Sequence, residues 1–381
     1  MATSEPLTNR SIGSRVKNVR ELRDMTQERV AEAMGFKDRQ TLSDIENGKR
    51  SLKAEELLRL AEILGRDLEF FLDPFVIAGE ARFSWRVSAE VPAETLEAFE
   101  ARTGKMIGLL RWLKEQESGP AEPLVANLRL TAKSSFEEAQ ARAEALVKQF
   151  NLGPVPAEKL GSWIEERLSI QVLYLDIPQT AVISGAYCHL KDLGVILINR
   201  GEGEGRRNYD VAHELFHALT WEYMEPQHQE ADAPEERFRG LASEDRNKAK
   251  RIENLADNFA AALLMPLESL GVLIDPKRRD DTAHLAEAAA RLHVTTKALG
   301  WRLFNLGWIN EDTRRALATE RPDRAPSPMP NRYSMGFAAM LHKAIDDGRL
   351  SARKAAKALD MNLTQLAMLF TDYGLDQPFE L

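Results

Sequence analysis

Cysteine is nearly absent from this chain of 381 residues, which has only Cys188 and therefore no intramolecular disulfide. A single cysteine is compatible with a reducing compartment. Its place in the strand-like segment VISGAYCHL favours a buried small hydrophobic residue over a nucleophile. An excess of positive charge is also lacking, since the formal net charge is −8. Any DNA binding must therefore come from a local pattern and not from a basic chain.

Long apolar runs are missing as well. The first ten residues, MATSEPLTNR, lack the apolar core of a signal peptide, and no apolar stretch approaches the length of a membrane span. The composition, 44% hydrophobic and 29% charged, is that of a globular protein, and 381 residues are long for one core. We expect a cytoplasmic protein of two or three domains that has no membrane partner.

What the chain does have, first, is a run of short helical patterns over residues 11–73. Thr26 and Asp38 are suited to cap two successive helices, and Gly35 permits a sharp turn between them. The first turn of the second helix would project toward the major groove, where Arg and Gln can pair with base edges. The residues we expect to contact DNA are Arg39, Gln40 and Ser43 at the bases, and Gln27 at a phosphate.

A helical bundle that mediates only protein contacts is the alternative for this segment, because residues 1–73 hold nearly equal numbers of basic and acidic side chains. However, the stretch MTQERVAEAMGFKDRQTLSDIENGKRSLKAEELLRLAEILG closely resembles the lambda-repressor-like (Xre) helix-turn-helix family over about 60 residues. The resemblance implies a five-helix DNA-binding domain whose partner is a double-stranded operator.

The second informative stretch is DVAHELFHALTWE, residues 210–222, which holds two of the seven histidines of the chain. On a helix, positions i and i+4 face the same way, so His213 and His217 can offer two imidazoles to one metal ion. Glu214 is rotated by about 100° from His213, which suits a general base that is not itself a ligand. Because apolar residues surround the pair, we expect a buried helix, and buried histidines need partners.

A zinc site of this kind needs a third protein ligand. The apolar helix RIENLADNFAAALLMP, residues 251–266, supplies Glu253 as the best candidate. Asp257, one turn later, could hydrogen-bond a ligating imidazole from outside the coordination sphere. Rival ligands lie in the charged loop before this helix: His228, Glu244 and Asp245.

The segments AHELFHAL and ENLADNFAAALLMP, with the preceding ISGAYCHL and VILINR, resemble the ImmA/IrrE family of zinc metallopeptidases over about residues 136–275. The resemblance implies a small α+β zincin-like domain with a short β-sheet and a bound Zn²⁺. It also implies metal ligands at His213, His217 and Glu253 and a general base at Glu214. Relatives cleave a repressor or partner protein in stress response, mobile-element control or phage defence.

Several segments keep alternatives open. We expect strands at 170–176, 181–190 and 194–200, and either of the last two could be a sheet edge that holds substrate or an interior strand. The loop 222–247 is either a surface insertion or a lid. His189 and Tyr209 have no assigned role. The helices at 348–375 are either a docking element or a second helix-turn-helix.

The sequence thus predicts a mainly α protein with a small α+β domain. Its predicted parts are a DNA-binding domain (1–75), a helical linker (76–135), a metallopeptidase domain (136–275) and a C-terminal helical region (276–381). The predicted function is a transcriptional regulator with a zinc endopeptidase of the HExxH type, acting on a protein substrate or neighbouring-gene partner. The alternative is a non-proteolytic transcription factor or antitoxin that uses the peptidase fold to bind a partner. A homodimer is compatible with this pattern.

Overall fold

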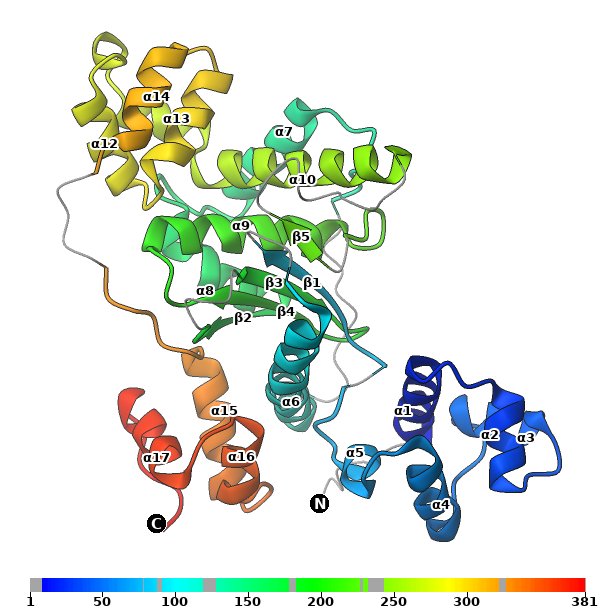
Figure 1. Cartoon of the computed structure of the whole chain (residues 1–381). Helices are drawn as coiled ribbons and strands as arrows, with labels where there is room; N and C mark the ends of the chain where they lie inside the picture. The colour runs from blue at the N-terminus through cyan, green and yellow to red at the C-terminus, as the bar shows by residue number, and fades with distance from the viewer. Residues whose placement is uncertain are drawn as a thin grey trace.

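The computed structural model describes residues 9–77, 79–87, 91–118, 128–177, 183–226, 229–231, 243–321 and 327–380. Figure 1 shows a mainly helical molecule with one small β-sheet near its centre and the N-terminal helices at one side. The mainly α prediction with a short sheet is confirmed.

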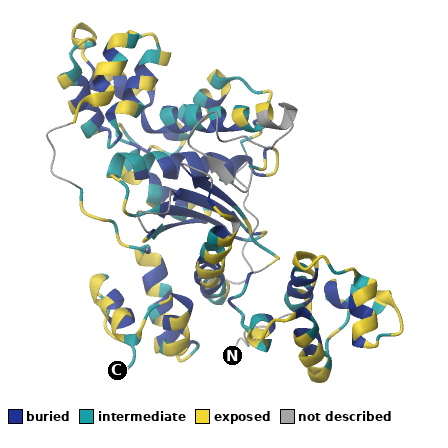
Figure 2. Ribbon diagram, viewed as in Figure 1, coloured by how far each residue is buried: buried dark blue, intermediate teal, exposed yellow. Residues whose placement is uncertain are grey.

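The N-terminal part consists of five helices: α1 (Asn9–Leu22), α2 (Gln27–Met34), α3 (Arg39–Glu46), α4 (Ala54–Leu64) and α5 (Leu68–Leu72). Thr26 and Asp38 accept backbone N–H groups at the starts of α2 and α3, so both predicted N-caps are present. Gly35 ends α2 in the left-handed conformation, with φ 74°, which glycine adopts without steric cost. The five helices enclose an apolar core of their own, as the buried inner faces in Figure 2 show.

Within the described residues, the central sheet has five strands in the order β2-β4-β3-β1-β5. Their bounds are β1 (Arg82–Val87), β2 (Ile170–Leu175), β3 (Ile183–His189), β4 (Gly194–Asn199) and β5 (Gln229–Ala231). β3 pairs antiparallel with both β4 and β1, whereas β2 runs parallel to β4 and β5 parallel to β1. The three strands predicted from sequence are confirmed, and β3 and β4 are interior strands.

Range 76–135, for which we predicted a helical linker, contains the strand β1 in addition to the long helix α6 (Ala93–Ser118). The segment RFSWRV alternates polar and apolar residues, the period of a strand, and its length was too short to stand out among helical patterns. β1 is hydrogen-bonded between β3 and β5. This segment is therefore part of the sheet and not only a connection.

Helices cover both faces of the sheet. On one face lie α7 (Phe136–Gln149), α8 (Ala157–Leu168), α9 (Glu204–Thr220) and α10 (Ser243–Leu264), which share one apolar cluster with the sheet. α6 covers the opposite face and packs in a second cluster with Trp85 and Val87 of β1. Figure 1 shows α9 and α6 on opposite sides of the strands. A helix buried between the sheet and α10 is well placed to hold a site away from water.

The remaining helices form two groups. α11 (Leu267–Leu273), the short 3₁₀ helix Pro276–Arg278, α12 (Thr282–Arg291), α13 (Thr296–Asn305) and α14 (Glu311–Thr319) follow α10 directly. The last group is α15 (Met335–Asp346), α16 (Ala352–Ala358) and α17 (Leu363–Asp372). Leu341 and Phe370 of this group are buried in the same cluster as Leu109 of α6. Of these two residues, Phe370 lies within 348–375, for which the docking and helix-turn-helix interpretations both stay predictions.

The helices in the described part of the chain each fall short of the requirements of a membrane span. Among the described residues, no single helix is both long and apolar enough to cross a bilayer. In this part of the chain, one bent pair, Asn247–Leu264 and Leu267–Leu273 across a 50° bend, reaches the length and composition together.

Candidate metal centre and DNA-binding helices

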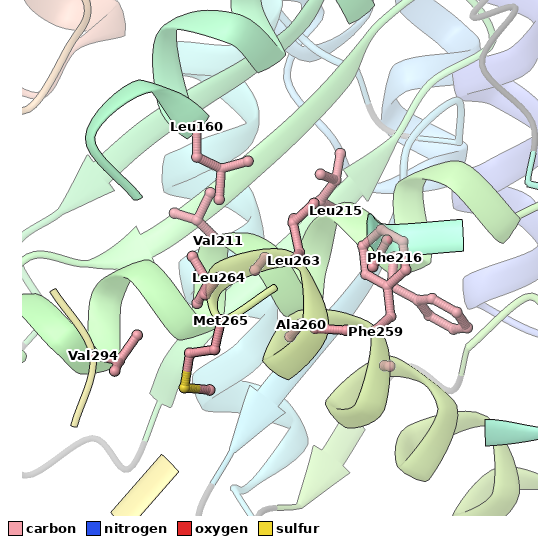
Figure 3. Close-up of a cluster of buried hydrophobic side chains, with 14 of the residues drawn as sticks. Leu160, Val211, Leu215, Phe216, Phe259, Ala260, Leu263, Leu264, Met265 and Val294 are labelled. Carbon is pink, nitrogen blue, oxygen red and sulfur yellow. The ribbon is translucent and has the colours of Figure 1, made fainter. Parts of the chain in front are cut away.

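Helix α9 is buried along most of its length. Its apolar residues Val211, Leu215 and Phe216 pack against Phe259 and Leu263 of α10, as Figure 3 shows. This packing fixes the two helices side by side and leaves their polar residues facing one another. His213 and His217 lie on α9, one turn apart, and Glu253 lies on α10.

Three side chains converge at one point between these helices. The Nε2 atoms of His213 and His217 lie 3.1 Å apart. Carboxylate oxygens of Glu253 lie 3.3 Å from His213 Nε2 and 3.6 Å from His217 Nε2. Each of the three residues is at most 4% exposed, so the group lies in a region of low dielectric.

These spacings fit a tetrahedral metal site. Zinc–nitrogen and zinc–oxygen bonds of about 2.0–2.1 Å place neighbouring ligand atoms about 3.3 Å apart in a tetrahedron. Two imidazoles and one carboxylate are also a ligand set that leaves a fourth position open. Among the described residues, these three are the group of histidine, cysteine or acidic side chains that could hold a metal ion.

Glu214 follows His213 directly and is fully buried. Neither of its carboxylate oxygens has a hydrogen-bond partner among the described residues. Burial raises the pKa of Glu214 to about 8, although the nearby charges of His213 and Arg86 oppose the shift. An unsatisfied buried carboxylate with a pKa near neutrality is suited to accept and return a proton.

Asp257 lies one turn after Glu253, and its Oδ1 is 3.0 Å from His213 Nδ1. Burial lowers the pKa of His213, as does the charge of Arg86, but the hydrogen bonds to Asp257 and Glu253 outweigh both and raise it to about 9. In His217 burial prevails and lowers the pKa to about 3. Asp257 thus stands where we expected a residue that orients an imidazole.

Sequence reasoning missed two arginines and an aspartate beside this group. Arg86 of β1 lies 3.3 Å from Asp210 Oδ1 and 3.7 Å from Asp257 Oδ1. Arg206 lies 3.1 Å from the other oxygen of Asp210, which is fully buried. Asp210 and Arg206 could have been noticed because they lie at i and i−4 on the motif helix. Arg86 had no such signal, because it is more than 120 residues away in sequence.

The rival ligands cannot be placed in this way. His228 lies outside the described residues, and so do the side chains of Glu244 and Asp245. Within the loop 222–247, residues 227–228 and 232–242 are also outside the described part, whereas Gln229–Ala231 form β5. The lid and insertion interpretations of this loop therefore both stay predictions.

His189 and Tyr209, which had no assigned role, each contact a named neighbour in the structure. The His189 ring stacks on Trp221, with centroids 4.9 Å apart, and burial lowers its pKa to about 4. Tyr209 donates its hydroxyl to the backbone oxygen of Asp257, 3.0 Å away. Tyr209 thus contacts the helix that bears Glu253, whereas His189, at the end of β3, contacts the residue that follows α9.

The predicted DNA-contacting residues are arranged on α2 and α3. Arg39 and Gln40 are exposed at the start of α3, and Leu42 and Ile45 anchor its other face in the core. The Gln27 amide donates to Glu46, at 2.6 Å, so part of its hydrogen-bonding capacity is used within the domain. Gln40 donates to Asp44, and Arg39 pairs with Glu28. Asn47 donates to the backbone oxygen of Ser43 at 2.7 Å and approaches its hydroxyl at 3.4 Å. The side-chain bonds of Arg39 and Gln40 would have to open for base contacts.

Comparisons with known families agree with both parts of the chain. The helix-turn-helix family matches residues 16–71, and the family described as the IrrE N-terminal-like domain matches residues 165–304. The second match begins and ends later than the predicted range 136–275. β1 lies outside both matched ranges. No curated protein matches the chain significantly.

Two solved structures show a partial similarity to this chain. A Mycobacterium tuberculosis transcriptional regulator is 20% identical, covers 44% of this chain and 46% of its own, and has a TM-score of 0.30. The apo form of the competence regulator ComR from Streptococcus vestibularis is 13% identical, covers 96% of this chain and 99% of its own, and has a TM-score of 0.17. This chain thus spans about half the length of the first, and neither TM-score supports a structural argument.

Proposed function

We propose that this chain, which joins an Xre-like helix-turn-helix domain to an IrrE/ImmA-like domain, is a DNA-binding regulator. In this proposal it cleaves a specific protein with a zinc-dependent peptidase site. The observation that supports it best is the convergence of His213, His217 and Glu253, with ligand atoms 3.1–3.6 Å apart and Glu214 beside them. Two helices held in one apolar core make this arrangement rigid, as a catalytic site requires.

Each residue has a separate role in this proposal. His213, His217 and Glu253 would hold Zn²⁺, which when bound would supply a Lewis acid for a peptide carbonyl and a lower pKa for water. Glu214 takes the proton from the attacking water and passes it to the leaving amine. Asp257 fixes the ring of His213 through Nδ1, so that Nε2 stays directed at the metal position.

At the other end of the molecule, α3 is proposed to enter the major groove of an operator. Arg39, Gln40 and Ser43 would face the bases, and Gln27 a phosphate. A repressor or the product of a neighbouring gene is the proposed substrate, and stress response, mobile-element control or phage defence the proposed setting. Cleavage of a partner would then change transcription at the bound site.

One observation favours a second function. Glu214 and His217 are fully buried, so a peptide substrate has no direct path to them in this conformation. A regulator or antitoxin that binds its partner through the outside of the domain needs no such path. In that case the zinc would stabilise the fold and the site would not turn over.

The substitution Glu214→Gln distinguishes the two functions. Glutamine preserves the shape but cannot take up the proton, and loss of a general base costs about 10²–10⁴ in rate. We expect the variant to keep about one zinc ion per chain and its DNA binding, while cleavage of the neighbouring-gene product and the change in reporter expression disappear. The measurements are metal analysis, a gel-shift titration and an immunoblot of the partner.

Two further variants make the result interpretable. Glu166→Gln makes the same chemical change on the exposed side of α8 and should leave every measurement unchanged. His217→Ala should lose the zinc. A Glu214→Gln chain that keeps the full response without a cleaved partner would establish the binding function instead. Zinc retained at full stoichiometry in His217→Ala would contradict the ligand set.

A further inference from the structure

The strand β1, which lies outside the family-matched ranges, places the charged residue Arg86 beside the candidate metal site. Trp85 and Val87 of this strand pack in the apolar cluster with α6, while Arg86 faces the opposite side, toward α9. Arg86 is only 5% exposed. Burying a guanidinium costs free energy unless acidic partners compensate for the lost hydration. The acidic partners of Arg86 therefore indicate what it does.

Those partners lie on the two helices that bear the ligands. Asp210 of α9 precedes His213 by three residues, and its Oδ1 is 3.3 Å from the Arg86 guanidinium. Asp257 of α10 follows Glu253 by four residues and lies 3.7 Å away. The same Oδ1 of Asp257 is 3.0 Å from His213 Nδ1. The guanidinium therefore joins α9 to α10 on the side of His213 away from Glu253.

We propose that Arg86 is a positioning residue of the metal site, which sets the distance between α9 and α10 and orients His213 through Asp257. This inference depends on the metal site of the proposed function. Arginine is suited to the task because its planar fork can pair with two carboxylates at once, which a lysine ammonium does with less directional control. The guanidinium also offsets the negative charge that Asp210 and Asp257 would otherwise bring together behind the ligand.

The same strand provides a matched comparison. Arg82 lies four residues before Arg86, so it projects on the same face of β1, and it pairs with Glu225 at 2.7 Å. Its side chain is 56% exposed, and its partner is not a residue of the site. Removing Arg82 thus removes one arginine and one ion pair from β1, with its contact to the Trp221 ring at the end of α9, but leaves the pairs of Arg86 with Asp210 and Asp257 in place.

The test measures the affinity of the full chain for zinc alone, by competition with a chromophoric chelator. Loss of a residue that supports a ligand from outside the coordination sphere typically weakens metal binding about 10–100-fold. We expect that loss for Arg86→Gln, a smaller one for Arg86→Lys, and none for Arg82→Gln. Circular dichroism of each zinc-free variant shows whether it is folded, and Arg86→Lys serves as the test if Arg86→Gln does not fold.

The variant Asp257→Asn and the double variant Arg86→Gln/Asp257→Asn test the route of the effect. If Arg86 acts through Asp257, the double variant should bind zinc about as weakly as the weaker single variant. Losses that multiply would overturn that route. Unchanged or tighter binding by the Arg86 variants would overturn the inference, because Arg86 would then act only as a nearby positive charge. A wild-type chain that binds no zinc would overturn the proposed function as well.

Discussion

Single residues in this protein gain their chemical properties from burial beside charged neighbours. Glu214 has no hydrogen-bond partner among the described residues and has a raised pKa, whereas Asp210, just as deeply buried, lies against Arg86 and Arg206. The two acids are one helical turn apart. The two acids differ in their contacts: both arginines form ion pairs with Asp210, whereas at Glu214 the charge of Arg86 only partly offsets the effect of burial on the pKa.

His189 provides a pH prediction at this scale. Burial, with the charge of Arg82, lowers its pKa to about 4 in the folded chain, compared with about 6.5 when unfolded. Between these values the unfolded chain binds a proton that the folded chain does not. The contribution of His189 to the free energy of unfolding should therefore be fully present above about pH 6.5 and should decrease as the pH falls toward about 4.

The measurement is chemical denaturation at several pH values for the wild type and His189→Phe. Phenylalanine can keep the stacking on Trp221 but cannot titrate. The stability difference between the two proteins should therefore vary with pH over this window. A constant difference between about pH 7 and about pH 4 would contradict the prediction, because other titrating groups are common to both proteins.

Among the elements, α3 illustrates how a helix is divided between core and surface. Leu42 and Ile45 are buried, and Arg39 and Gln40 are exposed near its N-terminus. The cap from Asp38 fixes where the helix begins and hence which residues form its first turn. An exposed first turn is the part of a recognition helix that contacts bases.

Replacing both Arg39 and Gln40 by alanine should weaken operator binding, by about 1–3 kcal/mol for each bidentate pair of hydrogen bonds to a base that is removed. The intramolecular bonds to Glu28 and Asp44 lie in the exposed surface and contribute little to folding. The variant should therefore unfold at nearly the wild-type temperature. A gel-shift titration at fixed salt gives the affinity, and Arg291→Ala, exposed on α12, is the control. An unchanged affinity would mean that α3 faces away from the bases.

At the scale of the whole molecule, the segment after α5 connects the DNA-binding helices to the central sheet. Arg15 of α1 is buried and donates to the backbone oxygens of Phe71, Asp73 and Val76. Phe75 and Ile77 then pack in the cluster that contains α6 and the sheet. The chain continues from there into β1, so residues 70–87 run from the DNA-binding domain to Arg86.

Two glycines of α6 test this connection. A Cβ at Gly108 would lie 2.0 Å from the backbone oxygen of Phe75, whereas one at Gly104 would make an ordinary contact of 3.5 Å with Ile77. Gly108→Ala should therefore destabilise the protein by about 1–3 kcal/mol, since the backbone has to move. Gly104→Ala should be neutral or stabilise it by up to about 1 kcal/mol, because alanine favours the helix. Denaturant unfolding compares them, and equal stabilities would contradict the close packing of α6 on Phe75.

Local features of both domains could be determined from the sequence. The caps at Thr26 and Asp38 and the turn at Gly35 each depend on residues only a few positions away along the chain. That His213 and His217 lie on the same face follows from the period of one helix. The position of Glu253 was predicted from an apolar helix with an acidic residue, and the structure brings it to these histidines. Its role as a ligand stays a prediction, as do the roles of Glu214 and Asp257 and the DNA contacts.

Only the tertiary structure decided what joins these local pieces. The sequence pattern of 76–135 indicated helix, because a short alternating segment is a weak signal beside long helices, and its strand character is fixed by hydrogen bonds to β3 and β5. Likewise, no spacing rule relates Arg86 to Asp210 and Asp257, which are far apart along the chain and meet only when β1 enters the sheet. Short-range hydrogen bonds and helical periodicity depend on residues that are close together in the sequence. The pairing of distant charges depends on which surfaces pack together, and that depends on the whole fold.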